Sequence, residues 1–246
     1  MQTLNRSRDK LIFALDLGED IGEAVRWADL LKDHVGMFKV GKEAFTRFGP
    51  RIVSSIRERG GKVFLDLKFH DIPNTVAMAS QAAVKLGISM FNMHALGGRE
   101  MMARAVDSVN KTARAMRVTP PVLLAVTVLT SLNDSDIKEI GFGCTTGELV
   151  LKLAVSAKDA GVPGVVASAQ DVIPIRKACG DDFIIVTPGI RPDNKVASDD
   201  QKRVVTPRDA IAMGADYLVV GRPIRLADDP VATADSITED IFSGLH

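Results

Sequence analysis

An aspartate and a lysine stand two positions apart at the end of an apolar segment, as Asp66 and Lys68. Side chains at positions i and i+2 of a β-strand point to the same face, so both charges would face the same space. Burying a charge is costly unless the charge is paired. The two residues therefore form either a structural ion pair or a catalytic pair.

Further charge is expected at the same place, and it favours the catalytic interpretation. Lys39 belongs to another apolar segment, and Asp71 follows Lys68 by three residues. Four charges of alternating sign in one place are hard to explain by packing, whereas ionisable groups cluster in active sites. His70 and His94 lie near the same segment ends, and each is explained more simply as a packing or hydrogen-bonding residue than as a proton-transfer group.

Glycine and arginine form a second pattern near the end of the chain. Gly189 and Arg191 follow one apolar segment, and Gly221 and Arg222 follow the next. Glycine turns, helix N-termini and guanidinium groups together bind phosphate well. Ordinary turns with solvated arginines are the alternative, but the two pairs together favour a phosphate site.

These residues need elements that bring them together, and the hydrophobic pattern supplies eight predicted strands. The strands are predicted at residues 11–15, 37–40, 63–67, 90–93, 122–126, 164–167, 183–186 and 217–220. Helical patterns lie between them, at residues 20–33, 75–86, 145–160, from 206 onward and at 231–242. Thr145 and Glu148 have the spacing of a capping box, and Thr206 followed by Pro207 is typical of a helix start.

An alternation of strand and helix repeated eight times predicts an α/β fold, a (β/α)8 TIM barrel, formed by residues 1–246 as a single domain. A doubly wound open sheet is the competing architecture. The glycine-rich dinucleotide turn that such sheets often carry after the first strand is missing, because the chain there is Asp16-Leu-Gly-Glu-Asp20. In the barrel, all the polar residues above would meet at the C-terminal mouth.

Composition excludes several classes of protein. The 246 residues contain 31 Lys and Arg and 31 Asp and Glu, so the formal net charge is zero, which argues against a nucleic-acid partner. A hydrophobic fraction of 46% is typical of a globular protein. The pattern predicts no signal peptide, no membrane span, no disulfide framework from the 2 cysteines and no metal site. We therefore expect a cytoplasmic protein.

The charged segment also resembles the signature of a known family. The ten residues Asp66-Leu-Lys-Phe-His-Asp-Ile-Pro-Asn-Thr75 are similar to the signature of the orotidine 5'-phosphate decarboxylases. The D-x-K-x-x-D core occurs in a wider group of phosphosugar barrels, and the longer form is more specific. The resemblance extends over most of the chain, through Ala14-Leu-Asp16, Phe38-Lys-Val-Gly-Lys42, Ala125-Val-Thr-Val-Leu-Thr-Ser131, Val186-Thr-Pro-Gly-Ile-Arg-Pro192 and Val219-Val-Gly-Arg-Pro223.

The resemblance implies decarboxylation of orotidine 5'-monophosphate to uridine 5'-monophosphate without cofactor or metal, as the last step of de novo pyrimidine synthesis. It also implies a homodimer. Lys68 matches the family's proton donor, Asp66 and Asp71 match the carboxylates that flank it, and Lys39 completes the charged network. Asp16 and Lys39 match residues that contact the ribose hydroxyls, and Thr130 matches a contact to the pyrimidine. Gln201, Gly221 and Arg222 match the phosphate-binding residues, with Arg191 close by. Asp71 and Thr75 match residues that enter the neighbouring subunit's site.

The implied reaction needs electrostatic help. Loss of CO2 from C6 leaves an electron pair in the plane of the ring, where no adjacent π-system absorbs it directly. An ammonium at that carbon would stabilise the pair and then protonate it, which is the role expected of Lys68. Remote binding of the phosphate would help to close loops, and residues 192–202 are the expected lid.

Two alternatives remain open from the sequence. A keto-gulonate phosphate decarboxylase or a hexulose phosphate synthase would share D-x-K-x-x-D but act through a metal-stabilised enediolate, and the uninterrupted His70-Asp-Ile-Pro-Asn-Thr75 argues against them. A catalytically idle nucleotide sensor would be expected to lose Lys68 or an aspartate, and all are present.

Overall fold

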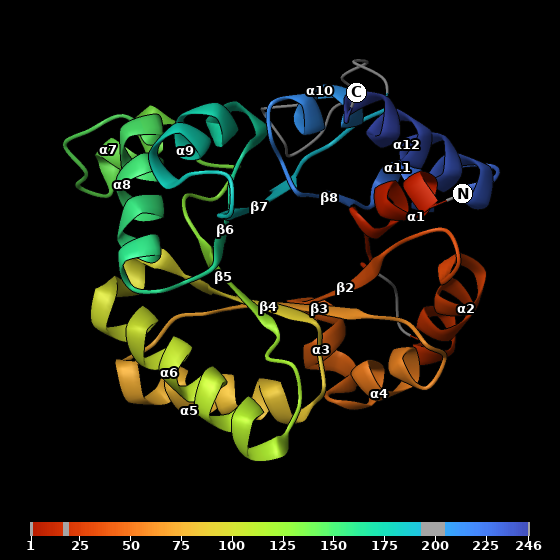
Figure 1. Cartoon of the computed structure of the whole chain (residues 1–246), viewed down its shortest axis with the longest axis horizontal. Helices are drawn as coiled ribbons and strands as arrows, with labels where there is room; N and C mark the ends of the chain where they lie inside the picture. The colour runs from red at the N-terminus through yellow and green to blue at the C-terminus, as the bar shows by residue number, and fades with distance from the viewer. Residues whose placement is uncertain (1, 17–19, 193–204, 246) are drawn as a thin grey trace.

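The computed structural model describes residues 2–16, 20–192 and 205–245, and it shows eight parallel strands closed into a barrel that helices surround (Figure 1). Each strand pairs with its sequence neighbours, and β8 pairs with β1 through Leu11 and Leu218. The predicted (β/α)8 barrel is therefore confirmed. The strands are β1 (Leu11–Ala14), β2 (Met37–Gly41), β3 (Val63–Phe69), β4 (Met90–His94), β5 (Val122–Val126), β6 (Gly164–Val166), β7 (Ile184–Pro188) and β8 (Tyr217–Val220).

The helices follow the strands around the barrel. They are α1 (Gln2–Asp9), α2 (Ile21–Leu31), α3 (Lys42–Phe48), α4 (Arg51–Arg57), α5 (Pro73–Lys85), α6 (Gly98–Met116), α7 (Asp134–Glu139), α8 (Thr146–Asp159), α9 (Val172–Cys179), α10 (Pro207–Ala212), α11 (Arg222–Arg225) and α12 (Pro230–Gly244). Short 3-10 turns, η1 (Ala95–Gly97) and η2 (Ala169–Asp171), precede α6 and α9. Among the described residues, none of the helices has both the length and the apolar character needed to span a bilayer.

Two predicted helix starts are confirmed by their caps. The Glu148 amide donates to Thr145 Oγ1 at 3.3 Å, and the Thr145 amide donates to the Glu148 carboxylate at 2.8 Å, which completes the capping box of α8. Thr206 caps α10, with Pro207 as its first residue. Helix α5 begins at Pro73, two residues before its predicted start, because proline is well suited to the first helical turn.

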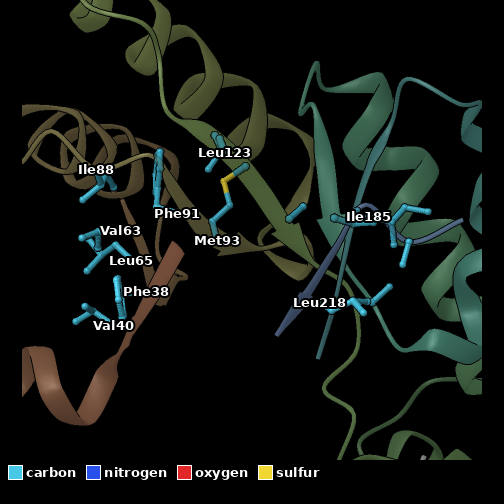
Figure 2. Packing of buried hydrophobic residues seen from close by; sticks show 14 of the residues in the cluster. Phe38, Val40, Val63, Leu65, Ile88, Phe91, Met93, Leu123, Ile185 and Leu218 are labelled. Carbon is cyan, nitrogen blue, oxygen red and sulfur yellow. The ribbon is translucent and has the colours of Figure 1, made fainter. Parts of the chain in front are cut away.

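Alternation along the strands builds two apolar layers. Outward side chains such as Phe38, Leu65 and Phe91 pack against the helices, and Figure 2 shows part of this layer. Inward side chains, among them Met37 and Phe64, fill the barrel itself. The inward face carries apolar residues toward the N-terminal end of the strands and polar ones toward the C-terminal mouth, so the core supports the polar groups from below.

Strand β3 breaks this regularity just where the charged residues lie. Its pairing with β4 advances from Leu65 to Phe69 while β4 advances only from Phe91 to Met93, which is a bulge in β3. Lys68 lies in the bulge with φ at 54°, in the left-handed region. For a residue with a Cβ, that conformation costs about 1–2 kcal/mol. Contacts around Lys68 must therefore stabilise this backbone conformation.

Candidate active site

A pocket of about 260 Å³ opens at the C-terminal ends of the strands, and residues on or after every strand line it. Its walls are the side chains or backbone of Ala14, Asp16, Lys39, Phe64, Asp66, Lys68, Asn92, Val126, Val128, Leu129, Thr130, Val166, Ala167, Pro188, Gly189, Arg191, Val219, Gly221 and Arg222. One wall, from β1 to β4, is charged. The middle, from β5 and β6, is mostly apolar, and the β7–β8 wall carries glycine and arginine.

The charged wall is a row of alternating ion pairs. Lys39 Nζ lies 3.4 Å from Asp16 Oδ1 and 3.3 Å from Asp66 Oδ2, and Lys68 Nζ lies 2.6 Å from Asp66 Oδ1. The side chains of Lys39 and Asp66 are each 12% exposed, whereas that of Asp16 is 58% exposed. Asp66 is thus a buried carboxylate between two ammonium groups, and Lys68 is one end of a row whose four members all line the pocket.

The row sets the charge state of its buried members. Burial alone would lower the pKa of Lys39, but the carboxylates of Asp66 and Asp16 outweigh burial and raise it. Burial alone would raise the pKa of Asp66, but Lys39, Lys68 and the hydrogen bonds from Lys68 and Asn92 lower it to about 2. At neutral pH, both groups are therefore charged.

Asn92 belongs to the site, and the sequence analysis missed it. It lies on β4 and is 1% exposed. Its Nδ2 donates to Asp66 Oδ1 at 2.7 Å, and its Oδ1 accepts from the Lys68 amide at 2.8 Å. The available signal was an uncharged polar residue inside a buried strand, because such a residue must find hydrogen-bond partners.

Asp71 and Thr75 lie outside this pocket. Both are exposed, and the Asp71 carboxylate accepts from the Ile72 amide at 2.7 Å. Asp71 therefore does not line this pocket together with Lys39, Asp66 and Lys68 in the described chain, and α5 begins two residues after it, at Pro73.

The two histidines near the mouth lie against each other, with ring centroids 5.3 Å apart. Neither lines the pocket. Burial lowers the pKa of His94 to about 4, and electrostatic interactions with His70, Lys42 and Lys68 act in the same direction. Its Nδ1 is buried and has no hydrogen-bond partner among the described residues. His94 is therefore neutral at physiological pH, as a packed residue would be.

The β7–β8 wall has the predicted glycine and arginine residues. Gly189 has φ at 84°, a conformation that favours glycine, and Gly221 lies so close to Ala14 that a Cβ would stand 3.2 Å from the alanine methyl. Arg191 and Arg222 both line the pocket, and the Arg191 amide donates to the Val205 carbonyl at 3.1 Å. Two glycines and two arginines thus come together on one side of the pocket.

Three further expectations concern single residues or segments. Thr130 lines the pocket after β5, on the mostly apolar side. Gln201, and residues 193–202 of the expected lid, lie outside the described residues. Within the described ranges, no three His, Cys, Asp or Glu side chains are grouped so that they could hold a metal ion.

Comparison with known proteins gives a consistent result. A family model described as Orotidine 5'-phosphate decarboxylase / HUMPS family matches residues 9–237. The orotidine 5'-phosphate decarboxylase of Syntrophus aciditrophicus is 62% identical over 239 residues, which are 97% of this chain and 95% of that protein. The enzyme of the same name from Geotalea daltonii is 52% identical over 242 residues, 98% of this chain and 100% of its own.

A solved structure extends the likeness to three dimensions. The crystal structure of orotidine 5'-phosphate decarboxylase from Lactobacillus acidophilus superimposes with a TM-score of 0.83 at 39% identity, covering 94% of this chain and 98% of that one. Sequence and fold therefore agree over almost the full length.

Proposed function

We propose roles for individual residues from the premise that this chain belongs to the orotidine 5'-phosphate decarboxylase family and converts orotidine 5'-monophosphate to uridine 5'-monophosphate and CO2, the last step of de novo pyrimidine synthesis. The observation that carries the proposal is the row of ion pairs that ends in the ammonium of Lys68 inside the pocket. The reaction creates negative charge at one carbon, and the Lys68 ammonium at the end of this row lines the pocket.

Lys68 is the proposed proton donor. When the bond between C6 and the carboxylate carbon breaks, its electron pair stays on C6 and CO2 leaves. The positive charge of Lys68 stabilises this pair, and one N–H proton then moves to C6, which gives uridine 5'-monophosphate and a neutral amine that solvent reprotonates. Support comes from the 2.6 Å contact with Asp66, which fixes the direction of the ammonium.

Asp66 and Lys39 are proposed to keep that ammonium in place. The low pKa of Asp66, about 2, means that this carboxylate remains negative throughout the working range and keeps its ion pair with the Lys68 ammonium. Lys39 balances the second oxygen of Asp66 and, with Asp16, offers polar groups to the ribose hydroxyls. Asp66 also contacts substrate in this proposal, because it lines the pocket.

The opposite wall is proposed to hold the phosphate. Arg222, Arg191 and the backbone at Gly221 supply donors that match phosphate oxygens, with Gln201 as an additional donor. Thr130 is proposed to contact the pyrimidine between the two walls. Binding energy from the phosphate then supports the reaction at the distant C6 atom.

The proposed reaction uses neither a metal ion nor an organic cofactor, because Lys68 provides the cation that the carbanion needs. The test is decarboxylation of orotidine 5'-monophosphate by the purified chain in excess chelator, followed by the change in ultraviolet absorbance. We expect the rate to be the same with and without chelator. Loss of activity that a divalent cation restores would contradict the proposal and favour the metal-dependent chemistry of related phosphosugar barrels.

We also propose that the chain works as a homodimer in which Asp71 and Thr75 enter the partner's pocket. Both are exposed, and they lie beside exposed apolar side chains, Ile72 at 67% and Met78 at 55%. Co-expression of K68A and D71A chains tests this. Each mixed dimer would contain one site with both native residues, so activity should return to on the order of a quarter of the wild-type level. Mixed dimers without recovered activity would contradict a shared site.

Two broader expectations are also kept as proposals. Residues 1–246 are proposed to form one catalytic domain, supported by the barrel that spans the described chain. A cytoplasmic location is proposed because Cys144 and Cys179 are both free thiols, which suits a reducing compartment.

A further inference from the structure

The bulge in β3 leaves one backbone group that the sheet does not pair in the regular way. Between Leu65 and Phe69, the pairing advances by four residues on β3 and by two on β4, so Asp66, Leu67 and Lys68 lie opposite the single residue Asn92. The Lys68 amide, inside this irregular stretch, donates to the Asn92 side chain at 2.8 Å. A side chain thus supplies an acceptor where the strand pairing is irregular.

The side-chain amide of Asn92 also holds the Asp66 carboxylate, which contacts the ammonium of Lys68. Asn92 Nδ2 donates to Asp66 Oδ1 at 2.7 Å, and this oxygen is the one that Lys68 Nζ contacts at 2.6 Å. Asn92 thus contacts both ends of Lys68, its backbone directly and its ammonium through Asp66. Only one orientation of the amide allows both bonds, because the flipped group would place N–H against N–H and oxygen against carboxylate.

Burial makes this arrangement rigid. Asn92 is 1% exposed and Asp66 is 9% exposed, so water does not compete for these hydrogen bonds. The φ of 54° at Lys68 lies outside the conformations that a lysine adopts readily, and it persists only where surrounding contacts hold it. Asn92 makes one of these contacts at the residue itself.

We propose that Asn92 is a positioning residue for the reaction: its side chain fixes the left-handed backbone of Lys68 and the carboxylate of Asp66 together, and so aims the ammonium of Lys68 into the pocket. This inference rests on the proposed role of Lys68 as proton donor. Asn92 is not assigned any chemical step, because its amide neither gains nor loses a proton.

The experiment compares three variants of the full chain. In N92A, both hydrogen bonds are lost, and we expect kcat to fall about 100-fold while KM changes less than about threefold, because misdirection by a fraction of an ångström costs turnover more than binding. N92D has the shape of asparagine and keeps an acceptor for the Lys68 amide, but it places a second carboxylate against Asp66. We expect its kcat to fall by about 100-fold or more.

T187V is the matched control. Thr187 is a fully buried polar residue on β7, on the helix-facing side of the strand with Ile185, and its hydroxyl has no hydrogen-bond partner among the described residues. Its substitution also removes a buried polar atom, but it leaves the contacts of Lys68 unchanged. We expect kcat within about twofold of wild type.

The outcomes separate positioning from a general effect on folding. A kcat of N92A within about fivefold of wild type, or a rise in KM with unchanged kcat, would overturn the proposal. If N92A does not fold, N92D decides alone, because near-normal turnover with a carboxylate at this position would show that the bond to Asp66 is dispensable. A separate K68A variant tests the proton donor. Normal turnover there contradicts the proposed function, whereas collapse there with normal N92A turnover contradicts only the role of Asn92.

Discussion

The two walls of the pocket are built by different means. On the β1–β4 wall, Lys39, Asp66 and Lys68 are carried by strands, and each contacts its neighbour at 3.3 Å or less. On the β7–β8 wall, Arg191 follows the turn at Gly189, and Arg222 begins α11 directly after Gly221, so both lie beyond the strand ends. A group that must meet one carbon atom needs the rigidity of a strand, whereas a phosphate can be bound by donors on turns.

The largest expected effect is at Lys68. We predict that K68A lowers kcat by about 10⁴-fold or more, because it removes both the stabilising charge and the proton. Affinity for uridine 5'-monophosphate, measured by calorimetry, should change much less, since the opposite wall is intact. If K68A retained near-normal turnover, the chemical role of the β1–β4 wall would be refuted.

A smaller effect is expected on the β7–β8 wall. We predict that R222A lowers kcat/KM for orotidine 5'-monophosphate by about 100-fold, because a charge-assisted contact to the phosphate is lost. The same substitution should leave slow decarboxylation of orotidine, which lacks the phosphate, within about twofold of wild type. Steady-state kinetics on both substrates measure this difference, and equal losses on the two would remove the phosphate role.

The smallest expected effect is on the pH dependence of the free energy of unfolding, through His94 beside the charged wall. The pKa of His94 is about 4 in the folded chain and 6.5 ordinarily, so between these pH values the unfolded chain binds a proton that the folded chain does not. Acidification therefore favours unfolding: the free energy of unfolding keeps its full value above pH 6.5 and falls as the pH falls toward 4. Because the group is only half-buried, we discount it to about 1–2 kcal/mol.

Substitution of His94 by asparagine should remove this dependence. We predict that the free energy of unfolding of H94N, measured by urea denaturation between pH 7 and pH 4.5, falls by about 1–2 kcal/mol less than that of wild type. Parallel pH profiles for the two proteins would show that His94 does not titrate abnormally.

The fold was largely predictable because each strand is a short apolar segment and because caps such as Thr145 with Glu148 fix helix starts. The long helix α6 was not predicted, although it spans Gly98–Met116. It begins directly after the 3-10 turn η1 (Ala95–Gly97), and glycine at its start gives no capping signal. A helix without a chemical signal at its ends is therefore harder to locate from sequence than one with a cap.

The site was predicted in part, and one correct prediction was reached by an incomplete argument. Strict alternation placed Asp66 and Lys68 on one face, and they do contact each other. However, Lys68 lies in a bulge with left-handed backbone, which alternation does not foresee. Asn92 was missed because its role depends on the pairing of β3 with β4, a contact between segments distant in sequence. Asp71 does not line the pocket of the described chain, and its role in the site stays a prediction.

The alternating order of charges along the β1–β4 wall also limits how such a barrel could evolve toward another reaction. Asp66 and Lys39 form the buried middle of the row. Replacing either one alone would leave its partner as a buried, unpaired charge, so new chemistry there requires coupled substitutions. Asp16 is different, because water reaches 58% of its side chain and can compensate for a lost partner. Substitutions that lead away from the present activity would accordingly begin at the exposed Asp16 and only then reach the buried Lys39 and Asp66.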